Sequence, residues 1–454
     1  MNTVKALPRV PRLTSLININ RFLANPIPVL ELYVKTYGDT FAFNLGGGPN
    51  RAIGSVNPVF AQHVLQKHHR RYAKSALQTE TLAEFIGQGL LTSEGPYWLR
   101  QRRLIQPGFH RDKLAALVDI MHNVVDRFLP RFDEAAATDQ PLEIVDTSME
   151  MAFRIVAETL FSKGMTEQEL RSLSGNVSQL QSFFIRRIRQ PYKSLWFRVS
   201  GQLRKHQELA KASQRIMLRI IEERRSQEGE HNDLLDMLLS SRYEDTGEGM
   251  SDKQLLEESL ILFLAGHETS ANALAWTFHL LSQHPAVVQR LREEMGTVLE
   301  GRRATFYDLP QLHYNRQVIQ ESMRLYPPAW IMDRVALEDD EVLGYKVPKG
   351  TMMVPFIYGI HHSPSIWPDP KRFDPDRFSK EQSKDRPAYA YLPFGGGPRL
   401  CIGNNFAMME MQLVVARLIE RYDFLPVEGQ KVDLLPLVTL RPRGGILLEV
   451  KSRK

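Results

Sequence analysis

One stretch, residues 251–283, constrains the fold more than any other part of the chain, because its pattern is that of a single long helix. Ser251 followed by Gln254 is a capping-box start, and a His-Pro dipeptide at 284–285 marks the end. About 33 residues rising about 1.5 Å each give a helix of roughly 50 Å, long enough to cross the whole molecule. Its middle, residues 260–264, is apolar on every side, so we expect a buried central helix.

The rest of the chain also has mainly helical patterns. Apolar residues recur at three- and four-residue spacing in 203–226 and in 285–300. Strand-like segments are confined to three places, namely 40–45 with 51–54, 335–354, and 434–450. The sequence therefore predicts a mainly α protein with small β-sheets (α+β). Because no fixed-period repeat and no Gly/Ser-rich or Pro-rich linker interrupts it, we expect residues 1–454 to form a single domain.

The composition is that of an ordinary folded protein. Hydrophobic residues make up 43% of the chain and charged residues 24%, which excludes collagen-like, disordered and low-complexity classes. A net charge of +6 is a mild excess for 454 residues, and we expect no nucleic-acid partner. The single cysteine excludes an internal disulfide framework and favours a reducing compartment.

The start of the chain lacks the pattern of a signal peptide, since Pro8 and Pro11 interrupt residues 1–18. The longest apolar run, 260–266, is far shorter than the roughly 18 residues that a membrane-spanning helix needs. We therefore expect a cytoplasmic protein without a transmembrane anchor.

A polar cluster, Ala265 to Ser270, interrupts the long helix directly after its apolar middle. Ala265 and Gly266 have almost no side chain, so they leave room beside the helix for a planar cofactor and a small ligand. Thr269 can direct its hydroxyl to a carbonyl one turn earlier, which opens a groove where a water can sit. Glu268 would feed protons to that position. The alternative, a solvated helix face, fits poorly with the apolar stretch just before it.

Cys401 lies in a segment rich in glycine and proline, Phe394 to Gly403, and a helical pattern follows from Asn405 to Tyr422. The positive end of a helix stabilises a thiolate. A thiolate in a loop whose glycines let a flat ligand approach closely is suited to be the axial ligand of an iron porphyrin. The alternative is a buried, inert cysteine.

Residues 394–403 match F-x-x-G-x-R-x-C-x-G, the pattern of the cytochrome P450 haem-thiolate monooxygenases, and the chain resembles this family. Four further segments resemble its other motifs: Ala265–Ser270 resembles [AG]-G-x-[DE]-T-[ST], Glu321–Arg324 resembles E-x-x-R, Pro375–Phe378 resembles P-x-R-F with Asp376 where Glu is frequent, and Trp98–Arg102 resembles W-x-x-x-R. E-x-x-R alone carries little weight, but the five motifs between 98 and 403 are together highly specific.

The resemblance implies a cytochrome P450 fold, haem b as cofactor, and roles for particular residues. Cys401 would ligate the iron, and Glu268 and Thr269 would deliver protons. The cofactor-binding residues would be Arg399, Arg102, Trp98, Arg334, Phe394 and Ala265, with Lys74 a weaker candidate for the haem propionates. Glu321, Arg324 and Arg377 would form a buried structural network, although the i,i+3 spacing of the first two is by itself also typical of a surface pair.

The reaction implied by the resemblance uses dioxygen, two electrons and two protons to insert one oxygen atom into a C–H bond. We expect a hydrophobic or amphiphilic substrate, such as a fatty acid, terpenoid or aromatic, and either hydroxylation or O-demethylation. The expected pocket residues are Phe85, Ile86, Phe183, Phe184, Ile261, Ala265, Trp330, Ile331 and Val438. A peroxide-using or isomerase-type member, which the Glu268-Thr269 pair disfavours, and a haem sensor or carrier without turnover are the alternatives.

Two basic stretches of the sequence indicate where binding partners would contact the chain. Arg100, Arg102, Arg103 and Arg111 lie in a segment without acids, and the resemblance implies that a separate ferredoxin- or flavodoxin-type electron donor, with its reductase, docks there. We expect no fused reductase and a monomer. Residues 176–207 also lack acids. The resemblance implies that they form the lid of the substrate channel, where their cations would favour anionic or polar substrates or rest on a membrane surface; a solvated basic loop is the alternative.

Two weaker signals predict no site. Gly46 to Gly48 is expected to be a turn and not a dinucleotide-binding loop. The pairs His68-His69 and His361-His362 lack a matching zinc ligand set, and we expect them at the surface.

Overall fold

A computed structural model describes residues 5–44, 51–162, 164–226 and 233–453. The predicted turn at Gly46 to Gly48 lies outside the described residues. The chain divides into two compact units, each built from separate stretches of sequence. Unit 1 comprises Met1–Ser75, Tyr314–Asn404 and Lys431–Gly444, and unit 2 comprises Ala76–His313, Asn405–Gln430 and Gly445–Lys454. That all residues act as one functional domain stays a prediction.

Unit 1 is built on a five-stranded sheet in the order β1-β2-β8-β5-β3, in which β2 and β8 are parallel and the other pairs antiparallel. Two hairpins, β6–β7 and β10–β11, complete its strands. The strands are β1 (Thr40–Asn44), β2 (Arg51–Ser55), β3 (Tyr72–Ala73), β5 (Arg334–Ala336), β6 (Asp340–Val342), β7 (Tyr345–Val347), β8 (Met352–Pro355), β10 (Asp433–Pro436) and β11 (Leu440–Arg443).

The helices of unit 1 are mostly short. Its core joins α3 to the first strands through the buried rings of Tyr33, Phe41 and Phe43. The helices and turns are α1 (Arg12–Ile17), α2 (Ile19–Ala24), α3 (Pro26–Tyr37), α4 (Pro58–Gln62), the π-helix η1 (His63–Lys67), η2 (His69–Arg71), α16 (His313–Leu325, whose first residue belongs to unit 2), α17 (Ile357–His361), η6 (Pro375–Phe378), α18 (Lys380–Ser383) and η7 (Gly397–Arg399).

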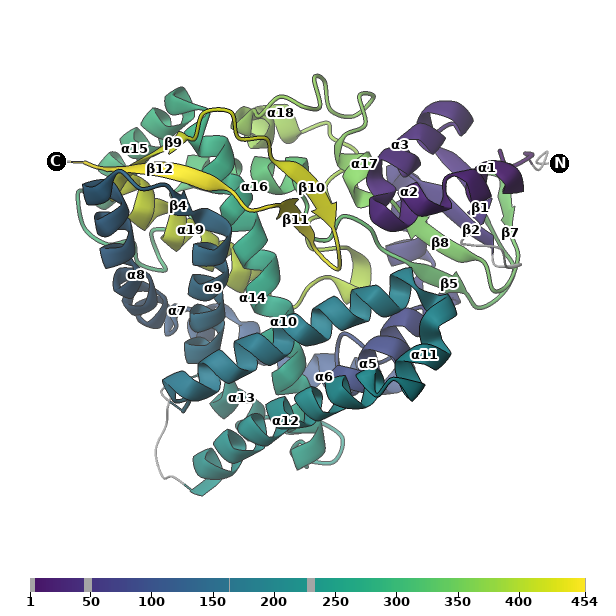
Figure 1. Ribbon diagram of the computed structural model, residues 1–454, viewed down its shortest axis with the longest axis horizontal. Coiled ribbons are helices and arrows are strands. Elements are labelled where there is room, and N and C mark those ends of the chain that lie inside the picture. The colour runs from purple at the N-terminus through teal and green to yellow at the C-terminus, as the bar shows by residue number, and fades with distance from the viewer. Residues whose placement is uncertain (1–4, 45–50, 163, 227–232, 454) are drawn as a thin grey trace. The chain divides into compact units, whose positions relative to one another are not determined.

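Unit 2 is almost entirely helical and is organised around α14, with α9 packed along it (Figure 1). A small sheet, β4-β12-β9, completes it. The elements are η3 (Leu77–Leu82), α5 (Ala83–Ile86), α6 (Gly95–Ile105), η4 (Gln106–Phe109), α7 (Arg111–Ala115), α8 (Val118–Thr138), β4 (Leu142–Glu143), α9 (Ile144–Phe161), α10 (Glu167–Arg189), η5 (Pro191–Lys193), α11 (Ser194–Val199), α12 (Gln202–Ser226), α13 (Leu234–Ser240), α14 (Asp252–Ser282), α15 (Pro285–Leu299), α19 (Asn404–Arg421), β9 (Tyr422–Pro426) and β12 (Leu447–Ser452).

The predicted long helices are confirmed almost to the residue. Ser251 and Gln254 form both hydrogen bonds of a capping box at the start of α14, which ends at Ser282. The helices α12 and α15 match the predicted segments 203–226 and 285–300. Apolar periodicity and capping residues are local signals, so they fix helix bounds without knowledge of the tertiary structure.

The prediction that strands are confined to three regions was wrong. β3, β4 and β9 lie outside those regions. β3 and β4 have two residues each, too few for an alternating pattern, and β9 follows α19 directly. Each exists because it pairs with a strand distant in sequence; for β4 and β9 that partner is β12. In the described part of the chain, no helix is long and apolar enough to span a bilayer.

Candidate functional site

The cysteine loop belongs to unit 1 and leads into α19. The amide of Cys401 donates a hydrogen bond to the carbonyl of Phe394 at 3.0 Å, which closes the loop on itself. Cys401 is exposed, although Leu392, two residues before the loop begins, is buried. The loop is therefore held in place while its thiol, three residues before a helix, stays accessible. This donor, in this position, fits the axial ligand of a haem.

Two glycines of this loop leave no space for a side chain. A Cβ on Gly396 would lie 2.5 Å from the ring of Tyr389. A Cβ on Gly397, whose φ is +68°, would lie 1.9 Å from the carbonyl oxygen of Leu65 in η1. The glycines therefore allow the loop backbone to pack directly against neighbouring segments of unit 1.

His361 supports the loop from inside unit 1. Its Nε2 accepts a hydrogen bond from the amide of Leu392 at 2.8 Å. Burial lowers the pKa of His361 well below its ordinary value and that of its neighbour His362 to about 4. The expectation that this pair lies at the surface was wrong for His361, which α17 carries inward; His362, directly after α17, is half-buried, as are His68 and His69.

Glu321, Arg324 and Arg377 lie together in unit 1. Two nitrogens of Arg324 donate to the two carboxylate oxygens of Glu321 at 2.6 and 2.7 Å. Nε of Arg377 lies 3.4 Å from the same carboxylate, and the three side chains are 0%, 0% and 8% exposed. Burial raises the pKa of Glu321, and the hydrogen bonds from Arg324 oppose that rise. The pair is thus part of a buried cluster and not a surface ion pair.

The remaining predicted cofactor residues divide between the units. In unit 1, Arg334 is buried and donates to the carbonyl of Asp333 at 2.7 Å, and Arg399 is half-buried. Lys74, also in unit 1, is buried. In unit 2, α6 carries the buried Trp98 and, one turn later, the half-buried Arg102. None of these cations is a freely solvated surface group.

The middle of α14 has one side that is accessible. Ala265 is exposed and Thr269, one turn later, is partly exposed, whereas most of the helix is buried. The Thr269 hydroxyl donates to the carbonyl of Ala265 at 2.9 Å, the bond to the preceding turn that the sequence predicts. A small residue and a hydroxyl therefore border open space on this side of the helix, as a planar cofactor requires.

Glu268 is 3% exposed, so it does not lie on a solvated helix face. Its carboxylate accepts a hydrogen bond from the side-chain amide of Gln181 on α10. Sequence reasoning missed Gln181, because no local pattern marks a residue that meets its partner only through the packing of two helices.

Two further carboxylates of α14 hold the loop that precedes α6. Glu258, which is fully buried, accepts a hydrogen bond from the amide of Leu90 at 3.1 Å, and Glu257 accepts one from the amide of Gln88. Sequence reasoning missed these contacts too. The loop is thereby tied to the same helix that carries Glu268.

Six of the predicted pocket residues belong to apolar clusters, four in unit 2 and two in unit 1. In unit 2, Phe85, Ile86, Phe183 and Ile261 are buried in one apolar cluster, and Phe184 is also buried. In unit 1, the indole of Trp330 donates to the carbonyl of Leu437 at 3.1 Å, beside Ile331 and Val438, the latter 46% exposed.

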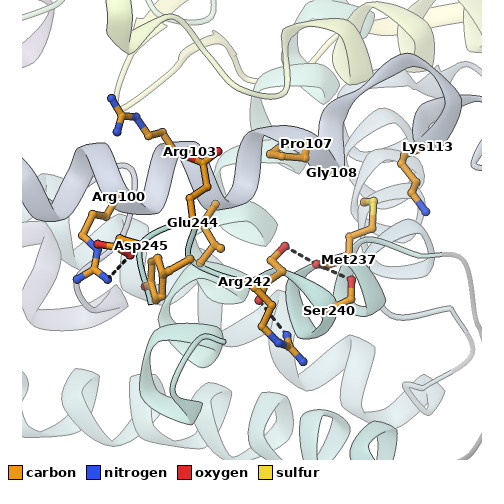
Figure 2. A pocket seen from close by; sticks show the side chains of 13 residues that line it. Arg100, Arg103, Pro107, Gly108, Lys113, Met237, Ser240, Arg242, Glu244 and Asp245 are labelled. Atoms are coloured by element: carbon orange, nitrogen blue, oxygen red, sulfur yellow. Dashed lines mark hydrogen bonds and ion pairs between the residues drawn. The ribbon is translucent and has the colours of Figure 1, made fainter. Parts of the chain in front are cut away.

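The basic stretch of α6 borders a cavity of about 420 Å³ on unit 2 (Figure 2). Arg100 pairs with Asp245 at 3.2 Å and lies over the ring of Tyr243, 4.3 Å from its centroid. The side chain of Arg103 points away from that pair in Figure 2. Asp245, from a loop distant in sequence, thus neutralises part of a surface whose own segment contains no acid.

Comparison with known proteins agrees with the motifs. The sequence pattern of the family described as Cytochrome P450 matches residues 5–449. Cyclooctat-9-en-7-ol 5-monooxygenase of Streptomyces melanosporofaciens is 34% identical over 396 residues, which cover 87% of this chain and 84% of that protein. Cyclooctatin synthase of the same organism is 31% identical over 408 residues, covering 90% of this chain and 87% of that protein.

A solved structure shares the fold. The crystal structure of the cytochrome P450DA heme domain has a TM-score of 0.88 to this chain at 22% sequence identity, and the match covers 99% of this chain and 98% of that one. The predicted mainly α fold with small sheets is confirmed.

Proposed function

Because this chain belongs to the cytochrome P450 family of haem b monooxygenases, we propose that Cys401 is the iron ligand of its haem. The observation that carries this assignment is the accessible thiol of Cys401 in a loop locked by the Phe394 carbonyl and by Gly396 and Gly397. No other cysteine exists in the chain, so no other thiolate is available. When bound, haem supplies dioxygen activation and electron transfer.

The chain's own residues bind, orient and move protons. Arg399, Arg102 and Arg334 provide planar cationic donors for the two haem propionates, and Trp98, Phe394 and Ala265 provide surfaces for the macrocycle. Thr269 holds a water with its hydroxyl, and Glu268 supplies that water with protons. The hydrogen bond that Gln181 donates to Glu268 supports this role, because it holds the Glu268 carboxylate in one position. Glu321, Arg324 and Arg377 keep the framework of unit 1 in place.

We propose a hydrophobic or amphiphilic small molecule as substrate, which is hydroxylated or O-demethylated. The apolar cluster around Phe183 and Ile261 supports this substrate class, since it offers few polar groups for recognition. The name of one relative states that it oxygenates cyclooctat-9-en-7-ol, an alcohol, at position 5. A substrate with an apolar body and one polar group is consistent with both observations.

We propose that electrons come from a separate ferredoxin- or flavodoxin-type protein, which docks on the basic face of α6. The exposed Arg103 supports this location, since it extends away from Asp245, the acid that pairs with Arg100 (Figure 2). We further propose that the protein acts as a cytoplasmic monomer.

The iron-ligand assignment is tested by Cys401→His. We expect the variant to lose the red-shifted Soret band of the reduced carbonyl complex, because that band requires a thiolate ligand. The absorption spectrum of the purified protein, reduced and exposed to carbon monoxide, is the measurement. An unchanged band would contradict the assignment.

The proton-delivery assignment is tested by Thr269→Ala. We expect substrate binding to persist while hydrogen peroxide release rises at the expense of product, because protons no longer arrive in order. Thr277→Ala is the matched control, since its hydroxyl makes the same bond to the preceding turn of α14, at 2.7 Å to Ala273, but is buried. Equal coupling of electrons to product in Thr269→Ala and wild type would count against the role of Thr269.

A further inference from the structure

The cavity beside α6, here called the α6 cavity, has the size of a small-molecule site. Its volume is about 420 Å³, within the range of about 300–1,000 Å³ that is typical of ligand sites. One wall is formed by the end of α6 with η4 and α7, and the other by α13 and the loop that follows it (Figure 2). All these elements belong to unit 2. Four cations and two carboxylates line the cavity, namely Arg100, Arg103, Lys113, Arg242, Glu244 and Asp245.

The lining of the α6 cavity carries an excess of positive charge that the protein does not neutralise. Arg100 pairs with Asp245 at 3.2 Å. In the part of the chain that the structure describes, the other three lining cations form no ion pair. They face one remaining carboxylate, that of Glu244, so the lining keeps an excess of two positive charges. A ligand with two negative charges would neutralise this excess.

Tyr243 fixes the loop that forms one wall of the α6 cavity. Its hydroxyl accepts hydrogen bonds from the side-chain amides of Gln101 on α6, at 2.9 Å, and of Gln254 on α14, at 3.0 Å. The guanidinium of Arg100 lies over its ring, 4.3 Å from the centroid. The wall is therefore in place before a ligand arrives, and a preorganised site loses less conformational entropy on binding.

The end of α13 orients the guanidinium of Arg242. Its Nη1 donates to the carbonyls of Leu239 and Ser241 at 2.8 and 2.9 Å. A guanidinium has five N–H donors in a planar fork, so two bonds from one nitrogen leave other donors for a ligand. Arg103 and Arg242 are both exposed and present such forks from opposite walls of the cavity (Figure 2).

Apolar side chains lie between the cations of the α6 cavity. In Figure 2, Pro107 of η4 and Met237 of α13 lie between Arg103 and Lys113. Met237 lies over Gly108, where an added Cβ would be 3.2 Å from the terminal carbon of the methionine. A methionine side chain adapts its shape to an apolar ligand surface. The cavity therefore offers contacts to an apolar group as well as to an anion.

We propose that the α6 cavity binds a phosphate monoester whose organic part is small and apolar. Near neutral pH a phosphate monoester carries about 1.5 to 2 negative charges, which matches the excess of two positive charges in the lining. Arginine binds phosphate in bidentate fashion, so the forks of Arg103 and Arg242 can hold it from two sides. Pro107 and Met237 remove the apolar part from water. A monocarboxylate leaves part of the positive charge uncompensated, and a neutral molecule leaves all of it.

Binding also affects electron delivery, a step that rests on the proposed docking of an acidic electron donor on α6. A bound dianion neutralises the charge of Arg103, which belongs to that docking face as well as to the α6 cavity. Association with an acidic protein then loses electrostatic steering, and reduction slows. The cavity is thus a regulatory site through which a phosphorylated small molecule lowers the rate of turnover.

The binding test is calorimetric titration of the oxidised holoprotein with phenyl phosphate, inorganic phosphate or phenol, at about 50 mM salt so that screening is weak. We expect phenyl phosphate to bind one site about tenfold more tightly than either of the others, because only it has both the dianion and the apolar ring. Arg242→Gln should weaken binding about tenfold or more. Arg171→Gln, at an exposed position on α10, is the matched control and should bind like wild type.

Glu244 provides a test of opposite sign. Its carboxylate is the like charge in the lining, so Glu244→Gln should tighten the binding of phenyl phosphate about threefold or more. Glu248→Gln is the control, because Glu248 is exposed on the same loop but does not line the cavity. Partial unfolding of a variant cannot explain an increase in affinity.

The effect on electron delivery is tested by stopped-flow reduction with an acidic ferredoxin at constant ionic strength. Saturating phenyl phosphate should lower the second-order rate constant about threefold or more in wild type. The same concentration should leave the rate unchanged in Arg242→Gln, which keeps Arg103. If Arg103→Glu does not change the rate without phenyl phosphate, the docking proposal fails, whereas the calorimetric test needs no electron donor and is unaffected.

Equal affinity for phenyl phosphate and inorganic phosphate would overturn the proposed ligand class, and equal binding by wild type and Arg242→Gln would overturn the site. So would a shift of the haem Soret band that accompanies binding and persists in Arg242→Gln, because it would place phenyl phosphate at the haem. An unchanged rate of reduction of wild type at saturating phenyl phosphate would overturn the regulatory role.

Discussion

At the scale of single residues, burial decides the protonation of several side chains that sequence would treat as ordinary charges. Glu410 on α19 is fully buried, and burial raises its pKa to about 8. Glu321 is equally buried, but there Arg324 opposes the rise. Burial thus raises the pKa of both glutamates, but only Glu321 has a cation at its carboxylate that opposes the rise. The difference has a measurable consequence for stability.

We expect Glu410 to make stability fall with rising pH. Between pH 4.5, the ordinary pKa of this group, and about pH 8, the Glu410 carboxyl is ionised in the unfolded chain but protonated in the folded chain. The free energy of unfolding therefore falls by up to about 1.4 kcal/mol per pH unit. Glu410→Gln removes that dependence. In urea unfolding, the free energy of unfolding of the variant relative to wild type should therefore rise by roughly 2–3 kcal/mol between pH 5.5 and pH 7.5.

The control is Glu428→Gln, because Glu428 is exposed. Its unfolding free energy should follow that of wild type at both pH values. Parallel pH profiles for Glu410→Gln and wild type would show that Glu410 is ionised in the folded protein.

At the scale of elements, a buried ion pair joins the ends of three helices in unit 2. Arg224 in the last turn of α12 donates two hydrogen bonds of 2.8 Å to Asp233, the N-cap of α13. Arg224 also donates to the carbonyl of Phe161 at the end of α9, and Ser162 donates to Asp233. The Asp233 side chain is 0% exposed, so the position of α13 depends on one guanidinium.

We expect Arg224→Met to destabilise the protein by about 3–5 kcal/mol, because it leaves the carboxylate of Asp233 buried without its cation. The neighbouring Arg225→Met is the control: its ion pair with Asp252 joins side chains 45% and 66% exposed, so its loss should cost less than about 1 kcal/mol. Urea unfolding of both variants is the measurement. Similar losses in the two variants would refute the argument.

At the scale of the whole molecule, the net charge of +6 influences the rate at which the protein associates with a charged redox partner. The charge is not spread evenly: Arg100 is paired with Asp245, whereas Arg103 extends away from that pair (Figure 2). Association with an acidic electron donor should therefore depend on ionic strength and on Arg103 more than on Arg100.

We expect the second-order rate of reduction by an acidic ferredoxin to fall about tenfold or more between about 50 and 500 mM salt, because screening removes the steering. Arg103→Glu should lower the rate at low salt, and Lys384→Glu, at an exposed position in unit 1, should have a smaller effect. Stopped-flow reduction is the measurement. A salt-independent rate would exclude electrostatic docking.

The sequence by itself determined the features whose physical cause is local. The caps and apolar middle of α14 set its bounds, and the glycines of residues 394–403 indicated the loop that carries Cys401, because backbone preferences and motif spacing need no distant partner. The same reasoning predicted the bond from Thr269 to the preceding turn.

Only the tertiary structure decided which side chains are buried and what they contact. Spacing alone left Glu321 and Arg324 as either a surface pair or a buried cluster, placed His361 wrongly at the surface, and missed Gln181 beside Glu268. β4 and β9 likewise exist only through pairing with β12. The physical reason is the same in each case: burial and hydrogen bonding join segments far apart in the chain, and sequence periodicity reports only on neighbours.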